Sequence, residues 1–278
     1  MKDDQAVQTV HPTAVVDEGA IIGDGVSVGP YAVIGPGVEI GEGSSIGPHV
    51  VIERDTRLGA ECRVSPGAVL GADPQDLKYM GERTWLEIGP RTVIRECATL
   101  NRGTARSGTT SIGSDCLIMA YAHIAHDCHI GDHVILSNAT NMGGHVEIDD
   151  WAIIGGLTAI HQFVRVGRHA MVGGASRIPQ DVAPYTIVAG SPAGVYGVNR
   201  IGLERRGFDE SEIDTLRDAY RTLFRGGIPL RRAAAELEED PSQHVQALAR
   251  FVLESERGVI STTRTRRAAS DGAGPDAA

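Results

Sequence analysis

Six of the ten histidines of the sequence lie between residues 123 and 161. They are His123, His126, His129, His133, His145 and His161. The unperturbed pKa of imidazole is near 6.5, so a histidine can act as a general base, hold zinc, or bind a phosphate or a hydroxyl group. Asp127 directly follows His126, and a histidine beside a carboxylate is typical of a general base. A single histidine is more often a solvated surface residue, but this density on an acidic chain predicts a functional site.

Glycine pairs near these histidines narrow the chemistry. The pair at 143–144 precedes His145, and backbone N–H groups left accessible by glycine can form an oxyanion hole. The pairs at 155–156 and 173–174 are eighteen residues apart, and stacked glycines would form a groove without side chains that can hold an acyl chain. The same glycines can also be simple corner residues. A base, an oxyanion donor and a groove together favour acyl transfer, and zinc ligation is the alternative.

The backbone that carries these residues has a period of six. Every sixth residue is aliphatic in the series Ile112, Ile118, Ile124, Ile130, Leu136, Met142, Ile148, Ile154, Ile160, Val166, Val172 and Ile178. This period fits neither an α-helix nor a plain strand, and it is typical of a parallel β-helix in which each hexapeptide forms one flat face. Three faces make a coil, so residues eighteen apart stack at a spacing of about 4.8 Å.

Stacking by eighteen predicts which of the candidate residues meet. Three neighbouring columns are Ala125–Gly143–His161, His126–Gly144–Gln162 and Asp127–His145–Phe163. We therefore expect His126, His145 and His161 on three successive coils, with His123 near the same corner.

The same frame of aliphatic residues runs from Val16 to Leu70, and it is interrupted twice afterwards. Polar residues replace the aliphatic positions in 71–86, and 101–111 is rich in Gly, Ser and Thr. Insertions into a solenoid usually leave the coil as loops on one face, which is often the binding face. Asp76, Lys78 and Arg102 place charge in these two segments. We therefore expect two loops that contribute to the site.

The hexads end at Ile178, a segment rich in Pro and Gly follows at 179–199, and helical periodicity then takes over. Asp209 and Glu212 form a capping pair that predicts a helix start, and the glycines at 226–227 predict its end. Shorter helices are expected at 229–238 and 242–256. The predicted domains are a β-helix at 11–190, a helical C-terminal domain at 191–260 and a disordered tail at 261–278.

Composition and charge exclude several classes of function. The net charge of −10 argues against general nucleic-acid binding, which needs a basic surface. No apolar run of about 18 residues and no signal peptide is present, so we expect a cytoplasmic protein without a membrane span. The four cysteines have no metal-type spacing and are expected to be small buried side chains in a reducing compartment.

Several motifs resemble those of the UDP-N-acetylglucosamine O-acyltransferases that begin lipid A synthesis. These motifs are YAHIAHDCHIGDH (121–133), NMGGHV (141–146), AIIGGLTAIHQF (152–163), MVGG (171–174) and GLERRGFD (202–209). The segments ADPQDLKY (72–79) and NRGT (101–104) resemble the two extruded loops of that family, although the family often has His where this chain has Asn101. GSPA (190–193) departs from the family's usual GNHA. The likeness runs from about residue 11 to 260.

The resemblance implies a left-handed parallel β-helix, a homotrimer and an acyl transfer. His126 would take the proton of the sugar 3-hydroxyl, Asp127 would orient it, and the Gly144 N–H would stabilise the oxyanion. The donor would be a 3-hydroxyacyl chain on acyl carrier protein, with UDP-N-acetylglucosamine as acceptor and with no metal or redox cofactor.

The resemblance also assigns residues to the binding of the substrates. The residues lining the sugar and acyl pocket would be Asp76, Lys78, His123, His145, His161 and Gln162. Asn199 and Arg205 would hold the nucleotide, and Gly174 would limit the acyl length. Alternative interpretations are a γ-type carbonic anhydrase-like zinc enzyme, which the histidine spacing fits poorly, and another sugar-nucleotide acyl- or acetyltransferase.

Overall fold

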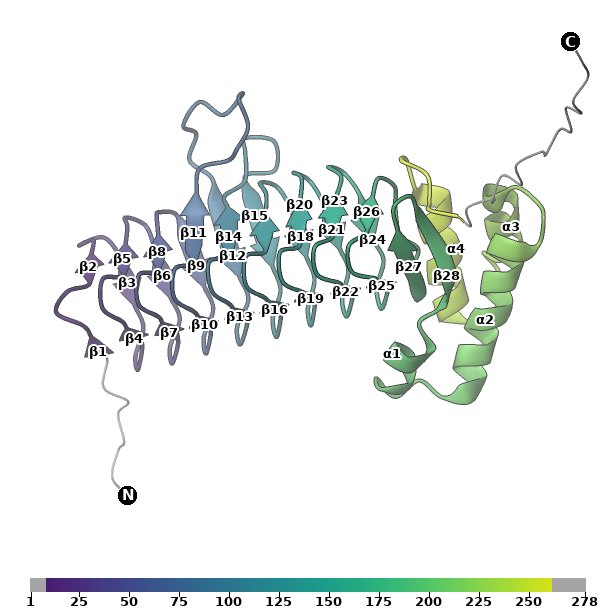
Figure 1. The fold of residues 1–278 in the computed structure, drawn as a ribbon, viewed down its shortest axis with the longest axis horizontal. Coiled ribbons are helices and arrows are strands. Elements are labelled where there is room, and N and C mark those ends of the chain that lie inside the picture. The colour runs from purple at the N-terminus through teal and green to yellow at the C-terminus, as the bar shows by residue number, and fades with distance from the viewer. Residues whose placement is uncertain (1–8, 262–278) are drawn as a thin grey trace, which may run out of the picture.

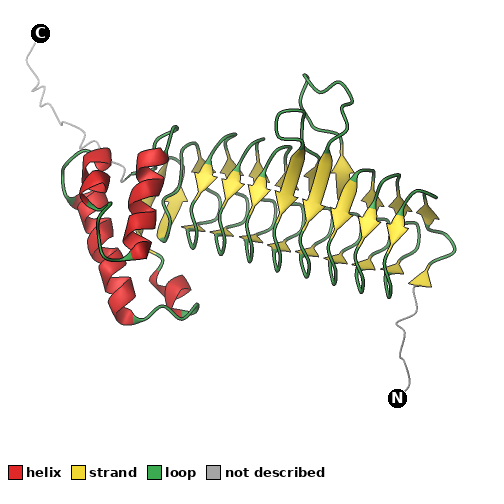
Figure 2. Ribbon diagram, turned by 180° about the vertical axis from the view of Figure 1, so that it is seen from behind, coloured by secondary structure: helices red, strands yellow, loops and turns green. Residues whose placement is uncertain are grey.

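The structure is a computed structural model that describes residues 9–261. A long coil of short strands forms most of the molecule, and a group of helices covers its C-terminal end (Figure 1). The strands and helices occupy separate parts of the chain (Figure 2). The predicted fold class, a parallel β-helix followed by C-terminal helices, is therefore confirmed. Within residues 9–261, the helices fall short of the length and hydropathy that a membrane-spanning segment requires.

Three sheets form the faces of the coil, and their strands run parallel except for β28, which pairs antiparallel with β27. Sheet 1 contains β1 (Thr9–Val10), β4 (Ser27–Val28), β7 (Ser45–Ile46), β10 (Arg63–Val64), β13 (Val93–Ile94), β16 (Leu117–Ile118), β19 (Ile135–Leu136), β22 (Ile153–Ile154), β25 (Met171–Val172), β27 (Thr186–Gly190) and β28 (Ala193–Val198). Sheet 2 contains β2 (Val15–Val16), β5 (Val33–Ile34), β8 (Val51–Ile52), β11 (Val69–Ala72), β14 (Thr99–Asn101), β17 (His123–Ile124), β20 (Asn141–Met142), β23 (Ala159–Ile160) and β26 (Arg177–Ile178). Sheet 3 contains β3 (Ile21–Ile22), β6 (Glu39–Ile40), β9 (Thr56–Leu58), β12 (Trp85–Ile88), β15 (Thr109–Ile112), β18 (His129–Ile130), β21 (Glu147–Ile148) and β24 (Arg165–Val166).

The core follows the aliphatic frame. The second residue of a typical strand points inward, and Ile118, Ile124 and Ile154 are fully buried. A second inward column, two residues before each strand's aliphatic residue, holds small side chains such as Ala122 and Cys128. Burying one aliphatic side chain stabilises a fold by about 1.5–3 kcal/mol, so two buried columns per face hold the narrow coil together.

Three of the four cysteines occupy the inward column, and the fourth does not. Cys62, Cys116 and Cys128 are buried, whereas Cys97 is exposed. The expectation that all four are buried is therefore wrong for Cys97. This residue lies at the tip of a corner with a φ of 56°, and that backbone conformation directs its side chain outward.

The two interruptions of the frame form loops at the same corner. Val69 pairs with Thr99, thirty residues on, and Thr99 pairs with His123, twenty-four residues on, instead of the usual eighteen. The extra residues are extruded between sheets 2 and 3 as loop 1 (73–84) and loop 2 (102–108), which project together from the coil in Figure 1. Both predicted loops are confirmed, and we call this edge the sheet 2–3 corner.

The C-terminal helices contain the expected elements and one more. They are α1 (Arg200–Glu204), α2 (Glu210–Arg225), α3 (Leu230–Glu236) and α4 (Gln243–Glu254). The predicted capping box of Asp209 and Glu212 starts α2, and Gly226 caps its end. The antiparallel β27–β28 hairpin was not predicted, because 179–199 is rich in Pro and Gly and has no clear period. The helix α1 was not predicted either, because five residues are too short to show a helical period. The hairpin straddles residue 190, where the domain boundary was expected, and residues 262–278 of the expected tail lie outside the described part.

An aromatic column joins the last coils to the helices. His133 stacks on Trp151 with ring centroids 3.8 Å apart, and the column continues through His169 to Tyr185 at centroid distances of 6.3 and 5.7 Å. Phe208, which precedes α2, contacts His169 edge to face at 5.2 Å. The junction between coil and helices is therefore packed by rings, and the imidazole of His169 lies among them.

Acidification should weaken this junction through His169. Burial, followed by the nearby Arg206 and Arg168, lowers the pKa of His169 to about 4. The unfolded chain binds this proton near pH 6.5 and the folded chain only near pH 4, so stability is lost as the pH falls between these values. From pH 7.5 to pH 5, the free energy of unfolding of the wild type should fall by about 2 kcal/mol more than that of a His169→Phe variant.

Urea titrations at the two pH values measure this difference. Phenylalanine suits the site because Phe163 has the equivalent backbone conformation, with a φ of 63° against 56° for His169. Equal losses in the two proteins would show that His169 does not carry the effect.

Candidate active site

The sheet 2–3 corner assembles the predicted columns. The His145 N–H donates to the His126 carbonyl at 3.0 Å, and the Phe163 N–H donates to the Gly144 carbonyl at 3.1 Å. Asp127, His145 and Phe163 share a left-handed backbone, with φ between 59° and 63°. The predicted stacking by eighteen residues is therefore confirmed at this corner.

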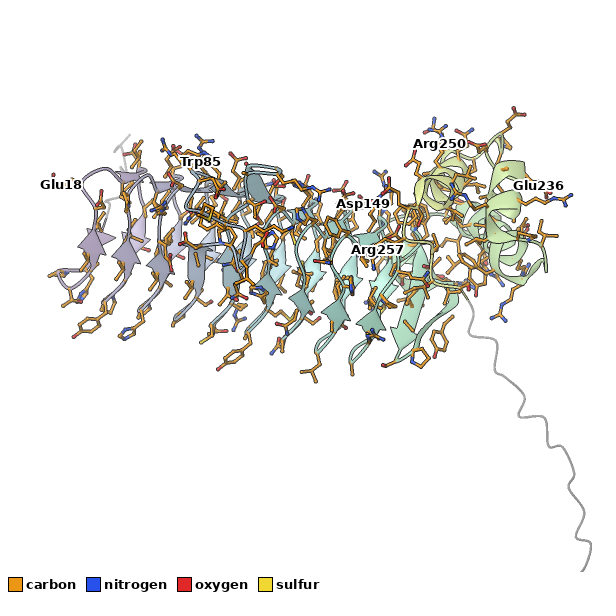
Figure 3. The ribbon with its side chains drawn as sticks, turned by 90° about the horizontal axis from the view of Figure 1, so that it is seen from above. Glu18, Trp85, Asp149, Glu236, Arg250 and Arg257 are labelled. Atoms are coloured by element: carbon orange, nitrogen blue, oxygen red, sulfur yellow. The ribbon has the colours of Figure 1, made fainter. Side chains whose placement is uncertain are left out.

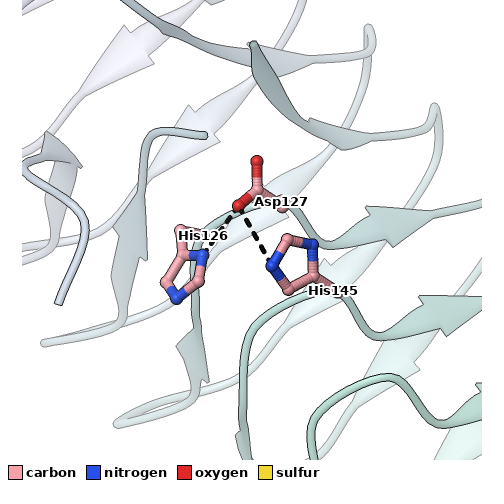
Figure 4. A group of neighbouring side chains, drawn as sticks. All are labelled: His126, Asp127 and His145. Atoms are coloured by element: carbon pink, nitrogen blue, oxygen red, sulfur yellow. Dashed lines mark hydrogen bonds and ion pairs between the residues drawn. The ribbon is translucent and has the colours of Figure 1, made fainter. Parts of the chain in front are cut away.

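His126 and Asp127 form a hydrogen-bonded pair (Figure 4). His126 Nδ1 lies 2.7 Å from Asp127 Oδ2, and the side chains are 14% and 0% exposed. An ionised carboxylate only accepts hydrogen bonds, so Nδ1 carries the proton and the lone pair of the imidazole is on Nε2. That nitrogen has no hydrogen-bond partner among the described residues. The pair therefore has the geometry of a general base held by a carboxylate.

Loop 2 supplies the other partners of Asp127. The Thr104 N–H and hydroxyl each donate to the carboxylate at 2.8 Å, and the Ser107 hydroxyl donates to it as well. Burial alone would raise the pKa of Asp127, but the hydrogen bonds from Ser107, His126 and Thr104 outweigh it and lower that pKa to about 2. Asp127 is thus a carboxylate at neutral pH. Thr104 and Ser107 were not predicted from the sequence, because a loop without a period gives no indication of what it contacts.

His145 and His123 flank the pair from different elements. His145 Nε2 lies 3.5 Å from Asp127 Oδ2, and the imidazole stacks on Phe163 at 4.5 Å. Burial lowers the pKa of His145, and burial followed by the neighbouring His126 lowers the pKa of His123. Thr99 binds His123 Nδ1 at 2.8 Å. Both histidines therefore favour the neutral form, which suits hydrogen bonding to a substrate.

Gly144 lies directly against the His126 ring. A Cβ atom added to this glycine would overlap His126 Cε1 and lie 2.7 Å from Nε2. The Gly144 N–H donates to no acceptor in the described part of the chain, whereas the neighbouring N–H groups of Gly143 and His145 are bonded. A free N–H beside the unprotonated nitrogen of the base is suited to bind an oxyanion.

Two adjoining cavities border the pair. One, of about 680 Å³, has Asp76, Lys78, His126, His145 and Gln162 in its walls, which are five of the predicted site residues. The other, of about 700 Å³, lies on the sheet 3 side, and the two share Arg106, His145 and Phe163. Arg106 places its guanidinium 5.1 Å from the Phe163 ring centroid. Loop 1 and loop 2 therefore both contribute to a chamber in front of His126.

Besides His123 and Gly144, four predicted residues line neither cavity. His161 is exposed, and its Nδ1 contacts Arg257 at 3.2 Å, a residue after α4 that is labelled in Figure 3. The Asn199 side chain is buried, caps α1 and donates to the His169 carbonyl at 2.9 Å. Arg205 is exposed at the end of α1, and Gly174 is exposed at the corner between sheets 1 and 2. A single chain does not bring these residues to His126.

Metal ligation was the alternative chemistry for the histidines. Among residues 9–261, one group of three could hold an ion, with ligand atoms of His126, Asp127 and His145 within 4.8 Å of one another. Both carboxylate oxygens of Asp127 already accept hydrogen bonds from Thr104 or Ser107, and Oδ2 also accepts from His126. An ion bound through His126 Nδ1 would have to replace the bond between His126 and Asp127. The geometry therefore fits a base better than a metal centre.

Comparison with protein families identifies the chain. Residues 181–260 match the family described as Udp N-acetylglucosamine O-acyltransferase, Domain 2, and residues 19–54, 37–72 and 109–140 match bacterial transferase hexapeptide repeats. The chain is 49% identical over 258 residues to an acyl-[acyl-carrier-protein]–UDP-N-acetylglucosamine O-acyltransferase of Paraburkholderia phymatum, covering 90% of this chain and 98% of that protein. This chain belongs to the UDP-N-acetylglucosamine O-acyltransferase family. The resemblance recognised in the motifs is confirmed.

Other members of this acyltransferase family agree in sequence and in structure. The enzyme of Verminephrobacter eiseniae is 51% identical over 248 residues, which are 89% of this chain and 95% of that protein. The solved LpxA of Acinetobacter baumannii superposes with a TM-score of 0.88 at 41% identity, covering 90% of this chain and 99% of that one. The acyltransferase of Francisella novicida superposes with a TM-score of 0.90 at 37% identity, covering 92% and 95%.

The protonation of His126 can be measured directly. In protein labelled with ¹⁵N-histidine, long-range proton–nitrogen spectra at pH 8 should show a protonated Nδ1 and an unprotonated Nε2 for this residue, assigned with a His126→Gln variant. Asp127→Asn should change that tautomer, because an amide can also donate to the ring. A proton on Nε2 in the wild type would contradict the assignment of the base.

Proposed function

We propose that this acyltransferase moves a 3-hydroxyacyl chain from acyl carrier protein to the 3-hydroxyl of UDP-N-acetylglucosamine, the first step of lipid A biosynthesis. Family membership and the names of the relatives supply the substrates. The observation that carries the chemistry is the free Nε2 of His126 beside the free N–H of Gly144, at the wall of a chamber. The cytoplasmic location inferred from the sequence is part of this proposal.

The geometry suggests one sequence of proton and bond transfers. His126 Nε2 takes the proton of the acceptor hydroxyl while that oxygen attacks the thioester carbonyl. The Gly144 N–H binds the oxyanion, and Asp127 stabilises the imidazolium that forms. Collapse of the intermediate breaks the carbon–sulfur bond, and the leaving thiolate recovers the proton from His126. The products are the ester and the free thiol of the carrier.

The chamber offers groups suited to a sugar nucleotide. Lys78 can bind phosphate oxygens, Asp76 can accept hydrogen bonds from sugar hydroxyls, and the Gln162 amide can both donate and accept them. The guanidinium of Arg205 is exposed and has no partner in the described chain, so it remains suited to the nucleotide phosphates. The Asn199 side chain already accepts from the Gly202 N–H in α1 and donates to the His169 carbonyl. In this proposal Asn199 therefore fixes the position of α1, at whose end Arg205 lies.

Replacing the base tests the proposal. With UDP-N-acetylglucosamine and a panel of acyl carrier protein thioesters, His126→Ala should lower the transfer rate by about 10²-fold or more. His133→Ala is the matched control, because His133 stacks on Trp151 at another corner and should retain the wild-type rate. A His126→Ala enzyme with more than half of the wild-type rate would rule out the assignment. Transfer from acetyl-CoA in place of the long thioesters would favour the acetyltransferase alternative.

The zinc alternative has its own measurement. The group of His126, Asp127 and His145 is the observation in its favour. Protein purified without added metal should contain far less than one zinc ion per chain, and dialysis against a chelator should leave transfer unchanged. Stoichiometric zinc whose removal abolishes activity would favour the alternative.

We further infer a homotrimer with the chamber near the subunit interface. Tyr121 and Leu157, at the corner between sheets 1 and 2, are 65% and 72% exposed, so this corner presents apolar surface that a neighbouring copy could cover. Gly174 lies at this same corner, away from His126 of its own chain, so a neighbouring copy is suited to complete the site. Light scattering should give about three times the chain mass of 29.4 kDa. A monomer at working concentration would contradict the inference.

The acyl length should depend on Gly174. A Cβ atom at this position would lie 3.2 Å from the Gly156 carbonyl, so a side chain would project over the stacked glycines. In Gly174→Met it would occupy roughly 5 Å of groove, about four methylenes, each worth about 0.8 kcal/mol when buried. The ratio of rates for long and medium thioesters, with an expected preference near fourteen carbons by resemblance, should therefore fall. A folded variant with an unchanged ratio would show that Gly174 only turns a corner.

A further inference from the structure

The segment Asn101–Thr104 contacts loop 1 at one end and the Asp127 carboxylate at the other. Its first two residues face loop 1. The Asn101 amide donates to the Asp73 carbonyl at 2.5 Å, and the Arg102 guanidinium donates to the Gly71 carbonyl and to the Asp73 carboxylate. These contacts hold the start of loop 1, at the point where the chain leaves the coil.

Arg102 also contacts a residue further along loop 1. Its guanidinium donates to the Tyr79 hydroxyl at 2.9 Å, and that hydroxyl donates to the Glu82 carbonyl at 2.9 Å. Tyr79 directly follows Lys78 in the sequence. A single guanidinium therefore spans loop 1 from its first residues to the part that lines the chamber.

Few apolar contacts hold the tip of loop 1. Leu77 and Met80 are 104% and 85% exposed, whereas Arg102 is 0% exposed. A buried guanidinium is a weak source of stability, because desolvation offsets most of the gain from pairing, and Arg102 Nε has no hydrogen-bond partner in the described chain. Such a residue is better explained by the conformation that it specifies. In this chain Arg102 fixes the side chain of Tyr79, the residue that follows Lys78.

The other end of the segment holds the catalytic pair. Thr104 donates twice to the Asp127 carboxylate, through its N–H and its hydroxyl. Between the two ends, the backbone at Gly103 is pressed against Thr109, so that an added Cβ would overlap the Thr109 backbone. The link from Arg102 to Thr104 is therefore short and tightly packed.

We propose that residues 101–104 couple the acceptor-binding loop to the base, with Arg102 as a positioning residue that sets Asp76 and Lys78 against His126. This inference rests on the proposed function, and it assigns to the NRGT motif the positioning of loop 1 relative to His126. Misplacement of a binding group by about 1 Å can cost on the order of 10²-fold in rate. Because the carrier thioester is not held by loop 1 in this account, the effect should fall on the acceptor.

Two variants separate positioning from folding. Tyr79→Phe removes only the hydroxyl that Arg102 binds, and it should raise KM for UDP-N-acetylglucosamine by about tenfold, the value of one hydrogen bond to a charged group. Arg102→Lys keeps the charge but loses the planar guanidinium with its several donors, and it should raise that KM further. In both variants, KM for the acyl carrier protein thioester should stay within about twofold of the wild type. Tyr31→Phe and Arg91→Lys are the controls, because Tyr31 lies on an early coil and Arg91 forms its two hydrogen bonds with Asp115 at another corner of the coil.

Limited proteolysis of the unliganded protein gives a readout that does not depend on the enzyme's activity. Trypsin should cut after Lys78 several-fold faster in Tyr79→Phe and Arg102→Lys than in the wild type and the two controls. Unchanged cleavage together with an unchanged acceptor KM in Tyr79→Phe would overturn the inference. Faster cleavage of the two variants, combined with a wild-type protein that shows no acyl transfer, would instead support the coupling and contradict the proposed function.

Discussion

Backbone pairing between residues eighteen apart is the constraint on which this molecule depends. It fixes the core, because each aliphatic residue stacks on the next at the spacing of neighbouring strands. It also fixes the site, because His126, Gly144 and Gln162 occupy equivalent positions on three coils. The base and its oxyanion donor are thus brought together by the coil itself, and each requires only a suitable residue in its column.

The extruded loops add what the coil cannot provide. A regular coil presents a convex corner with few groups to surround a ligand. Loop 1 supplies Asp76 and Lys78, and loop 2 supplies the hydroxyl groups that keep Asp127 ionised. Both insertions occur at the corner that carries the histidines, so they build a chamber around the reacting atoms without breaking the strands that stack above and below.

The sequence predicts the periodic parts of this structure well and the contacts of its irregular parts poorly. The hexads place the histidine columns, and the capping pair locates α2, because both depend on spacing along the chain. The partners of Asp127 in loop 2 and the β27–β28 hairpin were missed, because they depend on how nonperiodic segments fold back. Gly174, Asn199 and Arg205 were assigned by resemblance, and in a single chain they lie away from His126.

The central claim is that column stacking places the Gly144 N–H and the His126 imidazole against each other as one catalytic unit. Gly144→Ala tests it most directly, because the added methyl group would overlap the His126 ring, whereas in the control Gly197→Ala it would meet open space. The account predicts that Gly144→Ala stays folded but loses acyl transfer by about 10²-fold or more, while Gly197→Ala keeps the wild-type rate. A folded Gly144→Ala enzyme that transfers at the rate of the control would contradict the claim.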